Sequence, residues 1–218
     1  MLRVSSGAVA RGRLITIEGI DGAGKTTLAS ALAHALLDRD VDVELLREPG
    51  GVALSESIRA LVADPALRID PAAEALLYAA ARAQLVAERV RPALDEGRWI
   101  LLDRFVDSSL AYQGAARGLG VAQVAAINDL GTGGLQADRT LLLRIDPAAG
   151  CARLAARGGQ ADRMELLDDT FFQVAAAAYD DLARQAPQRI VTLDARLGRD
   201  ALLAAALDAL GDLLGPSS

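Results

Sequence analysis

The chain has 218 residues, a net charge of −6 and a hydrophobic content of 52%, which together suit one globular domain with a substantial core. The negative charge argues against a general nucleic-acid-binding protein, and no apolar run approaches the roughly 18–20 residues that cross a bilayer. The single cysteine, Cys151, excludes an internal disulfide and is weakly typical of a reducing compartment, so we expect a cytoplasmic protein. With His34 as the only histidine, the chain has too few ligands for a zinc site.

Strand-like and helix-like patterns alternate along the chain, which predicts an α/β fold: a five-stranded parallel sheet with helices on both faces. The expected strands are residues 14–17, 41–46, 99–103, 140–146 and 189–193. The expected helices are residues 27–37, 53–63, 70–96, 121–130, 147–156, 166–184 and 201–214. Residues 104–117 are expected to form a loop and a helix, broken by Gly114, Gly118 and Gly120.

Local signals support two of these helices. Asp70 and Pro71 are suited to the N-cap and the first position of the helix at 70–96. The helix at 53–63 has apolar residues at helical spacing, which predicts that they share one face: Leu54, Ile58, Leu61 and Val62.

The two ends read as tails around a single domain. Residues 1–12 carry two arginines and no acidic side chain, but they lack the length of a transit peptide, so we interpret them as a disordered tail. Residues 215–218 are interpreted in the same way. Residues 13–214 then form one domain, and residues 153–165, which contain glycines and arginines, are expected to form a lid.

The glycine-rich segment after the first strand matches the phosphate-binding loop G-x-x-x-x-G-K-[ST], followed by a helix. Glycines let the backbone N–H groups turn inward toward an anion, and the helix N-terminus adds positive potential. Lys25, the only lysine of the chain, would reach the phosphates, and the Thr26 hydroxyl would hold Mg²⁺. A purely structural glycine turn is the alternative. The nucleotide-binding residues expected here are Gly19, Ile20, Asp21, Gly22, Ala23, Gly24, Lys25, Thr26 and Thr27.

Charged residues follow two further strands, at the edge of the sheet where ligands of this fold class bind. Asp103 is placed to organise Mg²⁺, although it could instead be a helix N-cap. Arg104 could hold a phosphate with two hydrogen bonds. Arg47 offers a second cation, and Glu48 a carboxylate for a metal, a water or a ligand hydroxyl.

Two other groups of residues could be functional or could have an ordinary structural role. Tyr78 and Arg82 share a helix face and could stack on a base and bind its edge, or be a core ring and a solvated charge. The arginines in or beside the lid could stabilise transition-state charge, or form a solvated basic loop: Arg153, Arg157 and Arg163.

Four segments together resemble the bacterial thymidylate kinases, and the resemblance covers roughly residues 13–195. They are the phosphate-binding loop, Arg-Glu-Pro-Gly-Gly at 47–51, Leu-Tyr-Ala-Ala-Ala-Arg at 77–82 and Asp-Arg-Phe-Val-Asp-Ser-Ser-Leu-Ala-Tyr-Gln-Gly at 103–114. The likeness continues through residues 143–147 to Asp-Arg-Met-Glu at 162–165. The resemblance implies a P-loop nucleoside monophosphate kinase that uses ATP and Mg²⁺ to convert dTMP to dTDP, usually as a homodimer built through helices.

Carried over by position, the resemblance implies roles for the acceptor site. Arg47 and Arg104 would hold the dTMP phosphate, and Tyr78, at the family's usual phenylalanine position, would stack on thymine. Asp21 would meet the 3′-hydroxyl of the sugar, and Tyr112 would exclude a 2′-hydroxyl. The base edge would be read by Arg82, Ser109 and Gln113.

One departure bears on catalysis. Some relatives carry a catalytic arginine inside the phosphate-binding loop, whereas this chain has Gly22 and Ala23 there. The cation would then come from the lid, and which of the three lid arginines supplies it stays open. A GTPase is excluded because its Asn-Lys-x-Asp motif needs a second lysine. A kinase for another nucleoside monophosphate and a nucleotide sensor without turnover remain alternatives.

Overall fold

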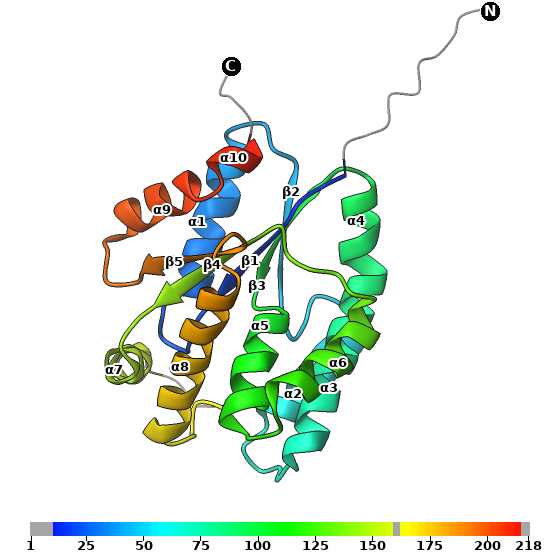
Figure 1. Ribbon diagram of the computed structural model, residues 1–218, viewed down its shortest axis with the longest axis vertical. Helices are drawn as coiled ribbons and strands as arrows, with labels where there is room; N and C mark the ends of the chain where they lie inside the picture. Colours follow the sequence, from blue (N-terminus) through cyan, green and yellow to red (C-terminus); the bar gives the residue numbers. More distant parts are fainter. Residues whose placement is uncertain (1–10, 159–161, 215–218) are drawn as a thin grey trace, which may run out of the picture.

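The computed structural model describes residues 11–158 and 162–214. Within them lies a five-stranded, all-parallel sheet with the strand order β2-β3-β1-β4-β5 (Figure 1). The predicted α/β fold is therefore confirmed. The strands are β1 (Leu14–Glu18), β2 (Val43–Arg47), β3 (Trp99–Asp103), β4 (Arg139–Arg144) and β5 (Ile190–Asp194).

Helices lie on both sides of this sheet (Figure 1). Side chains of successive strand residues point to opposite faces, and accordingly Ile15 and Leu101 belong to one apolar cluster while Leu14 and Leu102 belong to another. The described helices are α1 (Lys25–Leu37), α2 (Ala53–Ala63), α3 (Pro71–Leu85), α4 (Arg91–Asp95), α5 (Val106–Ser109), α6 (Val121–Thr132), α7 (Pro147–Arg157), α8 (Asp169–Gln185), α9 (Arg199–Asp208) and α10 (Gly211–Leu214). No helix in this part of the chain is long and apolar enough to cross a membrane.

The long helix expected at 70–96 is interrupted. It begins as predicted, with Pro71 at its first position and the Asp70 side chain accepting from the Ala72 N–H at 2.8 Å. A π-helical turn, η1 (Val86–Val90), then separates α3 from α4. Pro92 has no N–H, so the α-helical hydrogen-bond ladder lacks a donor immediately beyond this turn.

The expected break at Gly114 is wrong. That residue lies inside a second π-helical segment, η2 (Leu110–Ala116), where a Cβ would stand 3.1 Å from the Val121 Cα. Gly114 is therefore suited to close packing against α6. Gly118 and Gly120, both with positive φ, do end the segment.

Three further expectations need correction. The helix expected from residue 166 begins at Asp169, where the Asp168 side chain caps it, and the closing helix is divided into α9 and α10. On α2, Ile58 and Val62 are buried, but Leu54 and Leu61 are about half exposed, because α2 meets α3 along a narrower stripe. Most of the expected tails, residues 1–10 and 215–218, and residues 159–161 of the lid lie outside the described residues.

Candidate active site

The carboxyl ends of β1, β2 and β3 open into a cavity of about 450 Å³. Residues predicted from the sequence contribute most of its lining: Asp21, Gly22, Gly24, Lys25, Thr26, Thr27, Arg47, Glu48, Tyr78, Arg82, Asp103, Arg104, Ser109, Tyr112, Gln113, Arg153 and Arg157. Four predicted residues do not line it: Gly19, Ile20, Ala23 and Arg163. The sheet thus brings nearly all the expected groups to one place.

The phosphate-binding loop packs against the backbone of α7. Gly22 has a φ of +79°, and a Cβ there would lie 2.1 Å from the Gly150 carbonyl oxygen. Ala23 is buried in the core. Neither position has room for an arginine side chain, which agrees with the absence of a catalytic arginine from this loop.

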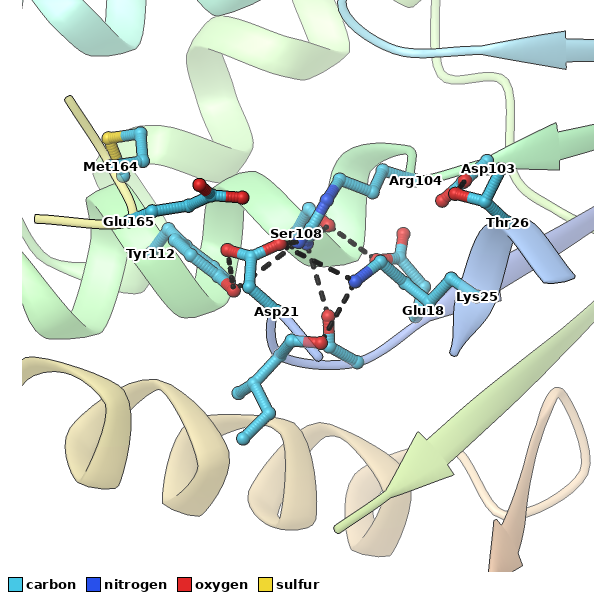
Figure 2. Close-up of polar contacts among 12 residues, drawn as sticks. Glu18, Asp21, Lys25, Thr26, Asp103, Arg104, Ser108, Tyr112, Met164 and Glu165 are labelled. Carbon is cyan, nitrogen blue, oxygen red and sulfur yellow. Dashed lines mark hydrogen bonds and ion pairs between the residues drawn. The ribbon is translucent and has the colours of Figure 1, made fainter. Parts of the chain in front are cut away.

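Lys25 begins α1 and points back across the loop (Figure 2). Its Nζ donates to the Ile20 carbonyl at 2.9 Å and lies 3.7 Å from the Asp21 Oδ1. Burial, with a smaller contribution from the charge of Arg104, lowers the pKa of Lys25 to about 8, although Asp21 opposes the shift. A phosphate placed here would raise the pKa of Lys25 again, because a nearby negative charge favours the charged form of the lysine.

Asp21, Arg104 and Tyr112 all line the cavity and form one cluster (Figure 2). Arg104 is ion-paired with the Asp21 Oδ1, while the Tyr112 hydroxyl donates to the Asp21 Oδ2 at 3.2 Å. The guanidinium lies 5.1 Å from the centre of the Tyr112 ring. Burial would raise the pKa of Asp21, but Arg104 and Lys25 outweigh it and lower that pKa to about 2. Asp21 is therefore an acceptor throughout the physiological range.

Glu18 fixes the chain around Arg104, and the sequence reasoning missed it. Arg104 has a φ of +71°, and Glu18 accepts from the next backbone N–H, that of Phe105, at 2.7 Å. The other oxygen of Glu18 accepts from Ser108 at 2.5 Å and from Tyr179 at 3.0 Å. Burial, reinforced by the charge of Asp107, raises the pKa of Glu18 to about 7. An acidic residue ending a buried strand was the one available signal.

Thr26 and Asp103 form an oxygen-bearing pair at the donor end. The Thr26 hydroxyl donates to the Asp103 Oδ2 at 2.7 Å. Within residues 11–158 and 162–214, no group of three or more histidine, cysteine or acidic side chains is arranged to hold a metal ion. One hydroxyl and one carboxylate fit Mg²⁺, which prefers oxygen ligands and completes its shell with water and phosphate.

Arg82 is buried, so its interpretation as a solvated charge is wrong. Its Nε donates to the Glu48 Oε2 at 2.7 Å, its Nη1 to the Ser109 hydroxyl at 2.9 Å, and its Nη2 to the Phe105 carbonyl at 2.9 Å. Asn128, on α6, also accepts from Arg82 and was missed by the sequence reasoning.

Glu48 is hydrogen-bonded and ion-paired with Arg82, whereas the Thr26 hydroxyl donates to Asp103. Glu48 therefore does not belong to the pair proposed to hold the metal. Burial raises its pKa, against the opposing charge of Arg82. Its second oxygen, Oε1, is buried without a hydrogen-bond partner among the described residues. The peptide bond between Glu48 and Pro49 is cis.

Two further acceptor-site residues, Tyr78 and Arg47, are placed differently. Tyr78 lines the cavity beside Arg82, and burial raises its pKa to about 12. Arg47 is half exposed and forms two hydrogen bonds with Glu56, at 3.0 and 3.1 Å. Glu56 also accepts from the Gly51 N–H at 2.9 Å, a link that the sequence did not reveal.

The three lid arginines have different partners. Arg153 donates to the Ala195 carbonyl at 3.1 Å, and Arg157 pairs with Glu165 at 2.7 Å. Arg163 pairs with Glu74 at 2.6 Å, outside the cavity lining. The structure thus separates Arg163 from the other two.

Known proteins resemble the chain over most of its length. A family model described as thymidylate kinase matches residues 17–204. The chain is 48% identical to the thymidylate kinase of Deinococcus radiodurans over 194 residues, which are 89% of this chain and 94% of that protein. It is 46% identical to the thymidylate kinase of Halorhodospira halophila over 187 residues, 85% of this chain and 87% of that protein. The crystal structure of thymidylate kinase from Ehrlichia chaffeensis matches with a TM-score of 0.75 and 28% identity, covering 92% of this chain and 99% of that one. Because the family match and these relatives span most of the sequence, the chain belongs to the thymidylate kinase family.

Proposed function

We propose that this chain transfers the γ-phosphoryl group of ATP to dTMP in the cavity at the carboxyl ends of β1, β2 and β3. An oxygen of the dTMP phosphate forms a bond to the γ-phosphorus, the bond to the β,γ-bridging oxygen breaks, and dTDP and ADP result. One observation carries the proposal. The same cavity joins the phosphate-binding loop to the buried group of Arg82 and Ser109, with Arg104 between them.

The donor end is assigned to the loop and the residues beside it. Backbone N–H groups from 19 to 27 would cradle the ATP phosphates, and Lys25 would neutralise charge on the migrating group. Thr26 and Asp103, already hydrogen-bonded at 2.7 Å, would hold Mg²⁺. When bound, Mg²⁺ supplies charge neutralisation across the β- and γ-phosphates.

The phosphate and sugar of dTMP are assigned to the middle of the cavity. Arg104 and Arg47 would bind the phosphate, which would then compete with Asp21 and Glu56 for these guanidinium groups. Asp21 would accept from the 3′-hydroxyl. Tyr112, held against Asp21 and Arg104, would fill the space of a 2′-hydroxyl.

The thymine is assigned to the far end. Tyr78 would stack on the ring, while Arg82, Ser109 and Gln113 would bind its polar edge. To bind the base edge, the guanidinium of Arg82 must be held in one orientation. Its hydrogen bonds to Glu48 and to the Phe105 carbonyl hold it in this way.

Stabilisation of the negative charge of the transition state is assigned to an arginine of the lid, because positions 22 and 23 of the phosphate-binding loop have no room for a guanidinium. Of the three candidates, Arg153 and Arg157 line the cavity, which favours them over Arg163.

We also propose a homodimer built through α2, α3 and α6, which lie together at one side of the molecule (Figure 1). These helices carry large exposed apolar side chains that a second copy would cover: Leu54, Leu61, Leu76 and Leu130. The substrates proposed here are cytoplasmic metabolites, so we place the enzyme in the cytoplasm.

A turnover screen tests the assignment of substrate. The full chain is assayed with ATP and Mg²⁺ against dTMP, dUMP, dGMP, dCMP and AMP, and kcat/KM is compared. We expect the highest value for dTMP. Preference for another monophosphate would assign the cavity to that nucleotide, and binding of nucleotides without turnover of any would support a sensor.

A further inference from the structure

Glu74 is a completely buried carboxylate that joins three segments of the chain. It lies on α3, one turn before Tyr78. Its Oε1 accepts from the Gln113 Nε2 at 2.9 Å, and its Oε2 accepts from the Arg163 Nη2 at 2.6 Å. Arg117 donates to both oxygens, at 3.2 and 3.0 Å.

We propose that Glu74 is a positioning residue that orients the amide of Gln113 toward the base and anchors residues 162–165 through Arg163. The inference rests on the proposed function, because it takes Gln113 as a contact of the thymine. It adds a residue that touches neither substrate and links the base end of the cavity to the lid.

The chemistry of the carboxylate sets the direction of the amide. Burial would raise the pKa of Glu74, but hydrogen bonds from Arg117, Gln113 and Arg163 outweigh it and lower that pKa. An ionised carboxylate only accepts, so Gln113 turns its NH₂ group toward Glu74. The amide oxygen is then left for a donor, which the N3–H of thymine supplies and the unprotonated N3 of cytosine does not.

Arg163 makes hydrogen bonds to α2 as well as to Glu74. Besides its pair with Glu74, its Nε donates to the Val62 carbonyl at 2.8 Å, and its backbone N–H donates to the Ala63 carbonyl at 3.0 Å. Both acceptors lie in the last turn of α2, where carbonyls lack helical partners. The segment anchored in this way carries Glu165, the partner of Arg157. Glu74 therefore influences Arg157 through Arg163 and Glu165, without touching Arg157.

The charges around Glu74 decide which substitution is informative. Two guanidinium groups, both largely buried, share one carboxylate. Glu74→Gln keeps the shape but removes the charge, so it leaves two arginines without compensation and allows the Gln113 amide to rotate. Glu44 provides a matched control, because it also lies between two arginines, Arg89 and Arg98, but on β2 and away from the cavity lining.

The test is steady-state kinetics of the full chain with both substrates varied. We expect Glu74→Gln to raise the KM for dTMP and to lower kcat, each on the order of tenfold, as for loss of a charge-assisted hydrogen bond. The KM for ATP should stay within about twofold. Arg163→Gln should reproduce only the loss of kcat, and Gln113→Ala added to Glu74→Gln should not raise the KM for dTMP further. Glu44→Gln should leave all parameters within about twofold.

Other outcomes overturn the proposal. Equal changes in the KM for ATP and the KM for dTMP would show that Glu74 only supports the fold. The same would follow if Glu74→Gln and Gln113→Ala raised the KM for dTMP independently, so that their effects multiplied in the double variant. If Glu74→Gln does not fold, as judged by circular dichroism, Arg163→Gln decides, since the anchor requires a loss of kcat at an unchanged KM for dTMP. A wild-type chain that prefers another nucleotide would overturn the substrate assignment instead, and the same comparison would then be made with that nucleotide.

Discussion

Arg104 is ion-paired with Asp21, so the residue that follows β3 is tied to the phosphate-binding loop. Both residues of the pair lie in the place proposed for the phosphate and sugar of dTMP, and Asp21 also belongs to the loop proposed to bind ATP. A phosphate that binds Arg104 must share it with Asp21, and Asp21 must then find another donor. The 3′-hydroxyl of the acceptor sugar is such a donor, which makes the ion pair a direct link between loop and acceptor.

Asp21→Asn tests this contact. With the wild type, removal of the 3′-hydroxyl from dTMP should lower kcat/KM roughly tenfold, because a charge-assisted hydrogen bond is lost. In Asp21→Asn, removal of the 3′-hydroxyl from dTMP should lower kcat/KM by much less than in the wild type. The measurement is kcat/KM for dTMP and for its 3′-deoxy analogue with both proteins. Equal discrimination by the two would place the 3′-hydroxyl elsewhere.

Lys25 predicts a pH limit on catalysis. Since kcat/KM reports the free enzyme and the free lysine has a pKa of about 8, kcat/KM for ATP should fall as the pH rises through about 8. Lys25→Arg should flatten this limb at a lower overall rate, because a guanidinium stays charged. Lys25→Ala should cost roughly two or more orders of magnitude in rate. An unchanged rate for Lys25→Ala would end the assignment of the loop to ATP.

Thr26 and Asp103 are expected to control the response to Mg²⁺. Thr26→Ala and Asp103→Asn should each raise the Mg²⁺ concentration for half-maximal rate, on the order of tenfold. The first removes the hydroxyl and the second removes the carboxylate charge that would hold the metal. A chelator should abolish wild-type turnover. Calorimetric binding of dTMP alone should be unaffected by either substitution. Variants that respond to Mg²⁺ like the wild type would contradict this site.

The lid arginines should differ from one another. Arg157 is largely exposed, and within the described part of the chain its side chain is bonded to Glu165 alone, so its guanidinium is the one best able to turn toward the reacting phosphates. Arg157→Ala should therefore lower kcat most, on the order of a hundredfold. Arg153→Ala should cost less, because Arg153 is bonded to the Ala195 carbonyl. Small and equal losses for both would show that the lid only excludes water.

The strands and the phosphate-binding loop were predictable because their signals are local. The apolar run before Gly19 and the helix after Lys25 can be read within about 25 residues, and all five expected strands overlap those of the structure. Boundaries were less predictable where packing or backbone donors decide them. The π-helical turn before Pro92 is one example, and the half-exposed Leu54 and Leu61 on α2 are others.

The residues that support the site were missed for a different reason. Glu18 meets Tyr179, 161 residues away, and Glu74 meets Arg163, 89 residues away. In the sequence each is a single acidic residue in an apolar segment, and no spacing rule connects it to its partners. Groups that touch phosphate follow recurring motifs, whereas the groups that orient them depend on the tertiary structure.

Glu18 gives a prediction about stability. Its pKa in the folded chain, about 7, lies above the ordinary value of 4.5, so between these values the folded chain binds more protons than the unfolded chain. Its contribution to the free energy of unfolding is therefore complete below about pH 4.5 and is lost as the pH rises to about 7. The shift corresponds to about 3 kcal/mol at most. Glu18→Gln, which stays neutral, should remove this part of the pH dependence.

Urea denaturation of the wild type and of Glu18→Gln at pH 5 and pH 8 measures the effect. A glutamine retains one oxygen for the Phe105 N–H and presents an NH₂ group to the hydroxyls of Ser108 and Tyr179, so the variant should fold. Glu88→Gln, on the exposed side of η1, should keep the wild-type dependence on pH. If the wild type and Glu18→Gln lose the same stability between the two pH values, Glu18 is ionised in the folded chain. The hydrogen bonds to the Phe105 N–H, Ser108 and Tyr179 would then be made by a charged Glu18 carboxylate. The backbone conformation of Arg104 would not depend on the protonation of Glu18.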